Sequence, residues 1–152
     1  MIGLLQRVSR ASIDVEGETI AAIGRGIIAF VCAEPGDNEQ STDRLLERLL
    51  GYRIFPDARD RMNLSVKDVG GALMLVPQFT LAADTAKGMR PSFSSTAAPD
   101  VACALFDRLV ARARMLHPSV ANGRFGANMQ VSLINDGPVT FWLRAEPVAN
   151  RE

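Results

Sequence analysis

Apolar residues in the first third of the chain form runs separated by short polar breaks, a pattern typical of β-strands joined by turns. Residues 2–15 predict one or two strands, and Glu16-Gly17 predicts a turn into a strand at residues 19–23. Residues 24–26 predict a second turn before residues 27–33, a nearly continuous apolar run typical of a strand buried on both faces. We therefore expect an antiparallel meander.

Two later segments have the period of amphipathic helices. The first follows Asn38 or Ser41, either of which can cap it, and ends near Gly51. Its apolar stripe consists of Leu45, Leu46, Leu49 and Leu50. The second begins at Pro99, which suits a first helical turn, and ends at His117-Pro118. Its expected buried face comprises Val101, Leu105, Phe106, Leu109, Val110 and Leu116.

Between the helices, short strands are predicted at residues 53–55 and 62–65, and a buried strand is predicted at residues 72–76. Pro77 closes that buried strand, since proline lacks a backbone donor. Residues 82–98 show no period and predict a long loop, a kind of segment that is often functional. Residues 119–123 are expected to loop back toward the C-terminal strands.

The C-terminal part contains two strand-like runs, one that alternates over residues 128–133 and one rich in β-branched and aromatic residues over 139–143. The residues between them include Asn135-Asp136-Gly137, which tolerate positive φ and therefore predict a hairpin turn. Pro138 removes a backbone donor and restricts Gly137 before it. We expect a stiff dipeptide at the tip of this hairpin.

These elements predict an α/β fold of about seven to nine strands, mostly antiparallel with some mixing, and two helices that cover one side of the strand layers. With 152 residues, the chain is expected to form a single domain over 1–152 with one substantial core.

The composition of the chain limits the classes of protein to which it can belong. No apolar run approaches the ~20 residues that span a bilayer, and no signal peptide is recognisable, so we expect a cytoplasmic protein that binds no membrane. The net charge of zero gives no indication of a nucleic-acid partner, so any RNA-binding patch would have to gather some of the 17 Lys and Arg residues. Cys32 and Cys103 are expected to be inert core residues.

The residue types exclude several chemistries. One histidine and two scattered cysteines show no zinc-ligand spacing, and neither a Walker motif nor a dinucleotide fingerprint is present. A serine triad would need His117, which is better explained as a helix-terminal residue that interacts with backbone carbonyls. Thr80 is a candidate nucleophile, but no adjacent base is evident, and the alternative is a threonine that makes only local hydrogen bonds. Backbone N–H groups around Phe79 and Thr80 are a third possibility, because they can stabilise an oxyanion.

Two separated motifs in the same order, QFTLAAD…GMRPSF and MQVSLINDGPVTFWL, resemble those of the D-aminoacyl-tRNA deacylases. The similarity extends from MIGLLQRVSRASIDVEG through LLGYRIFPD and MNLSV almost to the end of the chain. One departure is Pro77, where the family usually has serine. A related animal branch that acts on mischarged tRNA is similar at this position, whereas Phe79 and the Asn-Asp-Gly-Pro-Val-Thr run favour the main branch.

The resemblance implies a β/β/α layered sandwich that works as a homodimer and hydrolyses the ester of D-aminoacyl-tRNA, and also of glycyl-tRNA, at the tRNA 3′ end. It implies substrate-assisted catalysis, in which the ribose 2′-hydroxyl supplies the activating group, without a cofactor, a metal ion or a DNA partner. Residues 78–80 correspond to the catalytic segment, which consists of Gln78, Phe79 and Thr80. The substrate-binding positions are Arg7, Pro77, Phe125, Met129, Gly137 and Pro138.

Four of these residues have specific implied roles. Arg7 holds the Gly-Pro motif of the partner subunit, although an arginine in such a strand can simply lie on the solvated face. Phe125 stacks on the terminal adenine, with a core position as the alternative. A cis Gly137-Pro138 bond presents carbonyls as a wall that rejects L side chains and cannot exclude glycine.

Two rival functions remain on the sequence alone. The first is a related deacylase with relaxed chirality, since Pro77 departs from the family serine. The second is a catalytically silent dimer that binds tRNA or a nucleotide.

Overall fold

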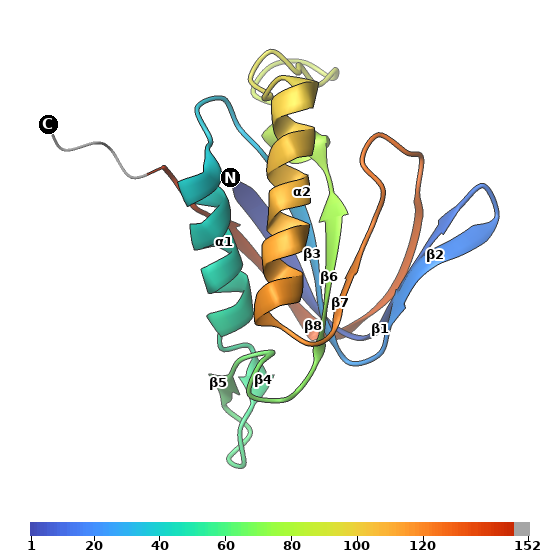
Figure 1. The fold of residues 1–152 in the computed structure, drawn as a ribbon, viewed down its shortest axis with the longest axis vertical. Coiled ribbons are helices and arrows are strands. Elements are labelled where there is room, and N and C mark those ends of the chain that lie inside the picture. The colour runs from blue at the N-terminus through green and yellow to red at the C-terminus, as the bar shows by residue number, and fades with distance from the viewer. Residues whose placement is uncertain (148–152) are drawn as a thin grey trace, which may run out of the picture.

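The computed structural model describes residues 1–147, in which six strands form one mixed sheet and both long helices lie on the same face of it (Figure 1). The strands of this sheet are β1 (Ile2–Val15), β2 (Glu18–Ile23), β3 (Gly26–Cys32), β6 (Ala72–Pro77), β7 (Val120–Asn122) and β8 (Gln130–Arg144). Strand β1 is antiparallel to β2, β3 and β8, whereas β6 is parallel to β3 and β7. A separate pair consists of β4 (Phe55–Pro56) and β5 (Met62–Leu64). The predicted α/β class with two helices is confirmed.

The helices begin and end close to the predicted positions. Helix α1 (Glu39–Gly51) is capped by Asn38, whose side-chain oxygen accepts from the N–H groups of Gln40 and Ser41, and the Ser41 hydroxyl in turn accepts from the N–H of Asn38. Such a reciprocal cap satisfies donors that a helix start would otherwise leave unpaired. Helix α2 (Pro99–Leu116) begins at its proline. No helix in residues 1–147 has the length and apolarity needed to cross a membrane.

The predicted buried face of α2 is right at its centre and wrong at its ends. Leu105, Phe106, Leu109 and Val110 are buried, and Ala113 continues this face. Val101 and Leu116 are 43% and 49% exposed, because they lie in the first and last turns.

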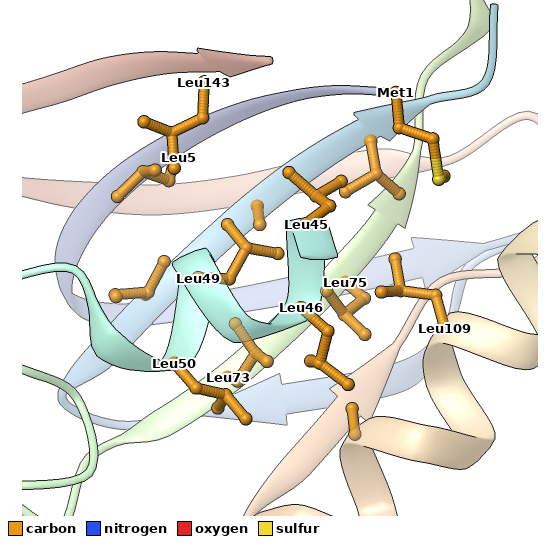
Figure 2. Close-up of a cluster of buried hydrophobic side chains, with 14 of the residues drawn as sticks. Met1, Leu5, Leu45, Leu46, Leu49, Leu50, Leu73, Leu75, Leu109 and Leu143 are labelled. Atoms are coloured by element: carbon orange, nitrogen blue, oxygen red, sulfur yellow. The ribbon is translucent and has the colours of Figure 1, made fainter. Parts of the chain in front are cut away.

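Two apolar clusters lie on opposite faces of the sheet. Leucines of α1, α2 and β6 pack together beneath the helices (Figure 2). The second cluster contains Ile13, Ile28 and Met74 and is covered by β2 and the start of β8. Strand β6 shows the division directly, because Leu73 and Leu75 enter the first cluster while the intervening Met74 enters the second. Strands β3 and β6 are therefore buried on both faces, as predicted, with helices on one side and curled strands on the other.

The predicted meander is wrong. A meander would place β2 between β1 and β3, whereas the observed order places β1 between β2 and β3. Strand β1 is 14 residues long, so its first half pairs with β3 and its second half pairs with β2. The segment 119–123, expected to be a loop, contains β7, whose three residues pair with β6.

The predicted C-terminal hairpin is also wrong. Strand β8 is a single strand that pairs with β1 along both strand-like runs, from Asp14↔Gln130 to Ile2↔Arg144. Residues 135–139 form an irregularity in this pairing, because Val8 faces Asn135 while Gln6 already faces Thr140. We call residues 135–139 the β8 bulge. The long β1 gives both runs a partner in the same direction, so the chain needs no reversal between them.

Candidate active site

A pocket of about 510 Å³ opens at the carboxyl end of β6, between the start of α2 and the segment that leads into β8; Figure 1 shows the elements that flank it. Its lining consists of Val76, Pro77, Gln78, Phe79, Thr96, Ala97, Pro99, Ala102, Phe125, Gly126, Ala127, Met129 and Val131. Five of the predicted site residues thus lie together in one pocket. Pro77, Gln78 and Phe79 line it beside Phe125 and Met129, although about 50 residues of sequence separate the first group from the second.

The segment after β6 exposes backbone donors beside this pocket. The N–H of Gln78 donates to the Val31 carbonyl of β3 at 2.8 Å, and a 3₁₀-helix, η1 (Phe79–Ala82), begins at the next residue. Within residues 1–147, the N–H groups of Phe79 and Thr80 have no hydrogen-bond acceptor. Two adjacent unpaired donors can bind a substrate carbonyl oxygen and the negative charge that forms on it.

In the part of the chain that the structure describes, Thr80 lacks the base that a nucleophile requires. Its hydroxyl accepts a hydrogen bond from the Gln78 side-chain amide, and it does not line the pocket. An amide cannot act as a base toward the hydroxyl, so nothing in the described residues activates Thr80.

The pocket contains no ionisable side chain among its lining residues within 1–147. Cys32 lies in a smaller adjoining pocket, where burial raises the pKa of its thiol and so keeps it neutral. His117 follows the far end of α2, a helix about 27 Å long that starts at the pocket, and its Nε2 lies 2.7 Å from the Gly71 carbonyl. The structure therefore supports a helix-terminal role for His117, and the residues 1–147 that it describes offer the pocket lining no protein base. No group of three His, Cys, Asp or Glu residues that could hold a metal is found in the described part of the chain.

Aromatic rings lie at the mouth and along the wall of the pocket. The Phe79 side chain is 58% exposed and contacts Phe93 at a centroid distance of 5.2 Å. Phe125 packs against Phe106 of α2 at 6.5 Å and also lines the pocket. Phe125 thus has a contact with a core residue and a face in the pocket, and its stacking on the terminal adenine stays a prediction.

Gly123 allows Met129 to form part of the wall. A Cβ at position 123 would lie 2.7 Å from the Met129 sulfur and 3.3 Å from Cδ of Pro77. Any side chain there would displace one of these two lining residues. This dependence was not predicted from the sequence, where the only local signal is a glycine six residues before the methionine.

Arg7 lies beside the β8 bulge and is mostly covered rather than on a solvated face, with 12% of its side chain exposed. Its Nε donates to the Asp136 carbonyl at 3.0 Å and lies 3.3 Å from the Asp136 carboxylate, while Nη1 donates to the Ile54 carbonyl at 2.8 Å. Arg7 thus holds the bulge of its own chain. The Asn135 side chain, which hydrogen-bonds at the base of the bulge, was also not predicted to have a role.

Gly137 and Pro138 are exposed and do not line the pocket of their own chain. The peptide bond between them is cis, as predicted, and Gly137 has a φ of +145°. A Cβ on Gly137 would lie 2.6 Å from Cγ2 of Val139, so this position requires glycine.

Comparisons with known proteins agree with this geometry. The family model described as D-Tyr-tRNA(Tyr) deacylase matches residues 4–144. The chain is 59% identical to the D-aminoacyl-tRNA deacylase of Janthinobacterium sp. (strain Marseille) over 148 residues, covering 97% of this chain and 99% of that protein. It is 60% identical to the enzyme of the same name from Thioalkalivibrio sulfidiphilus (strain HL-EbGR7) over 147 residues, with coverages of 97% and 99%.

Two solved structures share the fold. The first, titled c-Myc DNA Unwinding Element Binding Protein, superposes with a TM-score of 0.92 at 33% identity, covering 97% of this chain and 100% of that one. The second, titled as a structural analysis of a probable eukaryotic D-amino acid tRNA deacylase, has a TM-score of 0.81 at 18% identity, with coverages of 93% and 97%. Because the family model and the sequence relatives span nearly the whole chain, this protein belongs to the D-Tyr-tRNA(Tyr) deacylase family.

Proposed function

We propose that this protein hydrolyses the ester bond of D-aminoacyl-tRNA and releases the free D-amino acid and the tRNA. Membership of the deacylase family supports the reaction. The observation that carries the mechanism is a pocket without ionisable side chains that adjoins the unpaired N–H groups of Phe79 and Thr80 within the described residues. Such a site suits an ester that is already reactive and needs positioning and electrostatic stabilisation rather than a protein nucleophile.

In this mechanism the two N–H groups bind the ester carbonyl oxygen and stabilise the negative charge that develops when water adds to the carbonyl carbon. The 2′-hydroxyl of the terminal ribose accepts the water's proton and passes its own to the departing 3′-oxygen. The ester C–O bond then breaks to give the D-amino acid and the tRNA 3′-hydroxyl. The RNA thus supplies the proton-transfer group that the pocket lining lacks.

A tRNA with a terminal 2′-deoxyadenosine, charged on its 3′-hydroxyl with D-tyrosine, tests this scheme in single-turnover assays. We expect its hydrolysis to be slower by a factor of about 10² or more, the usual contribution of proton transfer. Hydrolysis at the normal rate would refute the role of the 2′-hydroxyl and leave the deacylase activity intact.

We also propose that the enzyme is a homodimer in which the β8 bulge of one subunit closes the pocket of the other. Gly137 and Pro138 are exposed and remote from their own pocket lining, so a second copy is the natural recipient. An arginine carries five N–H donors, and Arg7 uses two groups, Nε and Nη1, in its own chain, which leaves donors for the partner's Gly-Pro carbonyls. Those carbonyls form a wall where an L side chain would point.

This wall gives the expected substrate range. A D side chain points away from it, and glycine has no side chain to clash, so D-aminoacyl-tRNA and glycyl-tRNA are cleaved while L-aminoacyl-tRNA is spared. We assign the exposed pocket face of Phe125 to stacking of the terminal adenine. Because the substrates arise in translation, we place the reaction in the cytoplasm.

A related deacylase with relaxed chirality is a second candidate. The supporting observation is that Pro77, the residue that differs from the usual serine, lines the pocket and lies against Gly123. Cleavage of L-Tyr-tRNA at a rate comparable to that of D-Tyr-tRNA would favour this candidate over the first.

A further inference from the structure

Within residues 1–147, one side chain hydrogen-bonds across the base of the β8 bulge, and it is the amide of Asn135. Its Nδ2 donates to two backbone carbonyls, that of Arg7 in β1 and that of Val139 at the other end of the bulge, each at 2.9 Å. An amide nitrogen carries two hydrogens, so both are used. One group thus links the two ends of the bulge to each other and to the Arg7 carbonyl of β1.

The other side-chain contacts of the bulge do not join its two ends. The Asp136 carboxylate pairs with Arg7 but is 52% exposed, and exposed ion pairs contribute little. The Arg7 guanidinium also reaches the Asp136 carbonyl, which lies on one side of the bulge only. Gly137 and Pro138 have no side-chain donor, and both are exposed. Among the described residues, Asn135 is therefore the side chain that joins the two ends.

The side chain at position 135 must be a hydrogen-bond donor, because both of its partners are acceptors. The carbonyls of Arg7 and Val139 both point their lone pairs at the Asn135 amide. A carboxylate of the same shape would place negative charge against two carbonyl oxygens and would push the bulge away from β1. Asn135→Asp is thus a nearly isosteric change that reverses the interaction.

We infer that Asn135 is a positioning residue that sets the chiral selectivity of the enzyme by holding the Gly137–Pro138 segment in place. It touches neither the pocket nor the Phe79 and Thr80 donors, so it acts on which stereoisomer is rejected and not on the hydrolytic step. This inference rests on the proposed role of the bulge as the wall against L side chains.

The test compares the wild-type enzyme with Asn135→Asp in single-turnover deacylation of D-Tyr-tRNA and L-Tyr-tRNA. The matched control is Asn128→Asp, which makes the same chemical change at an exposed residue outside both the bulge and the pocket lining. Loss of two ordinary hydrogen bonds should lower the D-over-L selectivity by about tenfold or more, while the control keeps wild-type selectivity.

Hydrogen exchange gives a readout that does not depend on activity. The amides of the bulge residues that carry an N–H, within 136–139, should exchange faster in Asn135→Asp, while amides of β3 and β6 keep their protection. Unchanged selectivity in a folded Asn135→Asp protein would overturn the inference, as would unchanged exchange in the bulge. A wild-type enzyme that fails to cleave D-Tyr-tRNA would instead refute the proposed function, so the two failures are distinct.

If Asn135→Asp does not fold, Asn135→Ser provides the second variant. It removes the amide without adding charge and should shift the selectivity in the same direction by a smaller factor. Wild-type selectivity in this variant would also contradict the inference.

Discussion

Replacing Thr80 with alanine separates catalysis by backbone donors from catalysis by a threonine nucleophile. The change removes the hydroxyl and keeps the Thr80 N–H, which has no acceptor within residues 1–147. The hydroxyl makes one exposed hydrogen bond, with the Gln78 amide, and such a bond contributes about 0.5–1.5 kcal/mol. The rate should therefore fall by about tenfold at most, since about 1.36 kcal/mol corresponds to a factor of ten.

A nucleophile would behave differently. Removing the attacking group from a hydrolase costs about 10⁴ or more in kcat, and removing a single oxyanion donor costs about 10²–10³. Single-turnover deacylation of D-Tyr-tRNA distinguishes these ranges, and it isolates the chemical step from product release. Thr19→Ala is the matched control, because it removes a threonine hydroxyl that donates to Asp14 on the exposed β1–β2 ribbon, outside the pocket lining. A fall greater than about 10³ in folded Thr80→Ala would refute catalysis by backbone donors alone.

Three further changes test the pocket, the shared site and the core. Gly123→Ala should raise KM, because the added methyl carbon would lie 2.7 Å from the Met129 sulfur and displace it. Adding Met129→Ala in the same chain should restore KM, and a double variant as impaired as Gly123→Ala alone would contradict this steric explanation. Mixed dimers can be formed from an Ala102→Trp subunit, whose pocket is filled, and a Pro138→Ala subunit, whose pocket is open. These dimers should spare L-Tyr-tRNA, because the open pocket faces the intact Gly-Pro wall of the Ala102→Trp subunit. Cleavage of L-Tyr-tRNA as fast as by Pro138→Ala homodimers would exclude a shared site. Leu75→Ala should lower the free energy of unfolding by about 2–5 kcal/mol in urea titrations, since Leu75 is fully buried under the helices, and a loss below about 1 kcal/mol would contradict that packing.

Local patterns predicted the features that depend on near neighbours in sequence. The apolar run that contains Leu73, Met74 and Leu75 indicated a buried strand, and the structure divides these residues between two clusters. Asn38 is recognisable in the sequence as one of two candidate helix caps, beside Ser41, because a capping side chain bonds within three residues. Such interactions are encoded in a few adjacent positions and can be recognised without the fold.

The errors arose where long-range pairing decides the structure. Asn135-Asp136-Gly137 has the composition of a hairpin turn, but β1 offers 14 residues of pairing and keeps both halves of β8 in line. The bond between Arg7 and Asp136 joins residues 129 apart, so no local pattern could show it. The five pocket residues and the cis bond followed from resemblance to a family, because neither spacing nor composition brings β6 beside Phe125 and Met129.

Hydrolysis of D-Tyr-tRNA and L-Tyr-tRNA by the wild-type protein, measured side by side under single-turnover conditions, tests the central claim most directly. We predict rapid release of D-tyrosine, slower but measurable release of glycine from glycyl-tRNA, and no release of L-tyrosine above the uncatalysed rate. Comparable cleavage of both tyrosine stereoisomers would contradict the chiral wall, and cleavage of neither would contradict the enzymatic function itself.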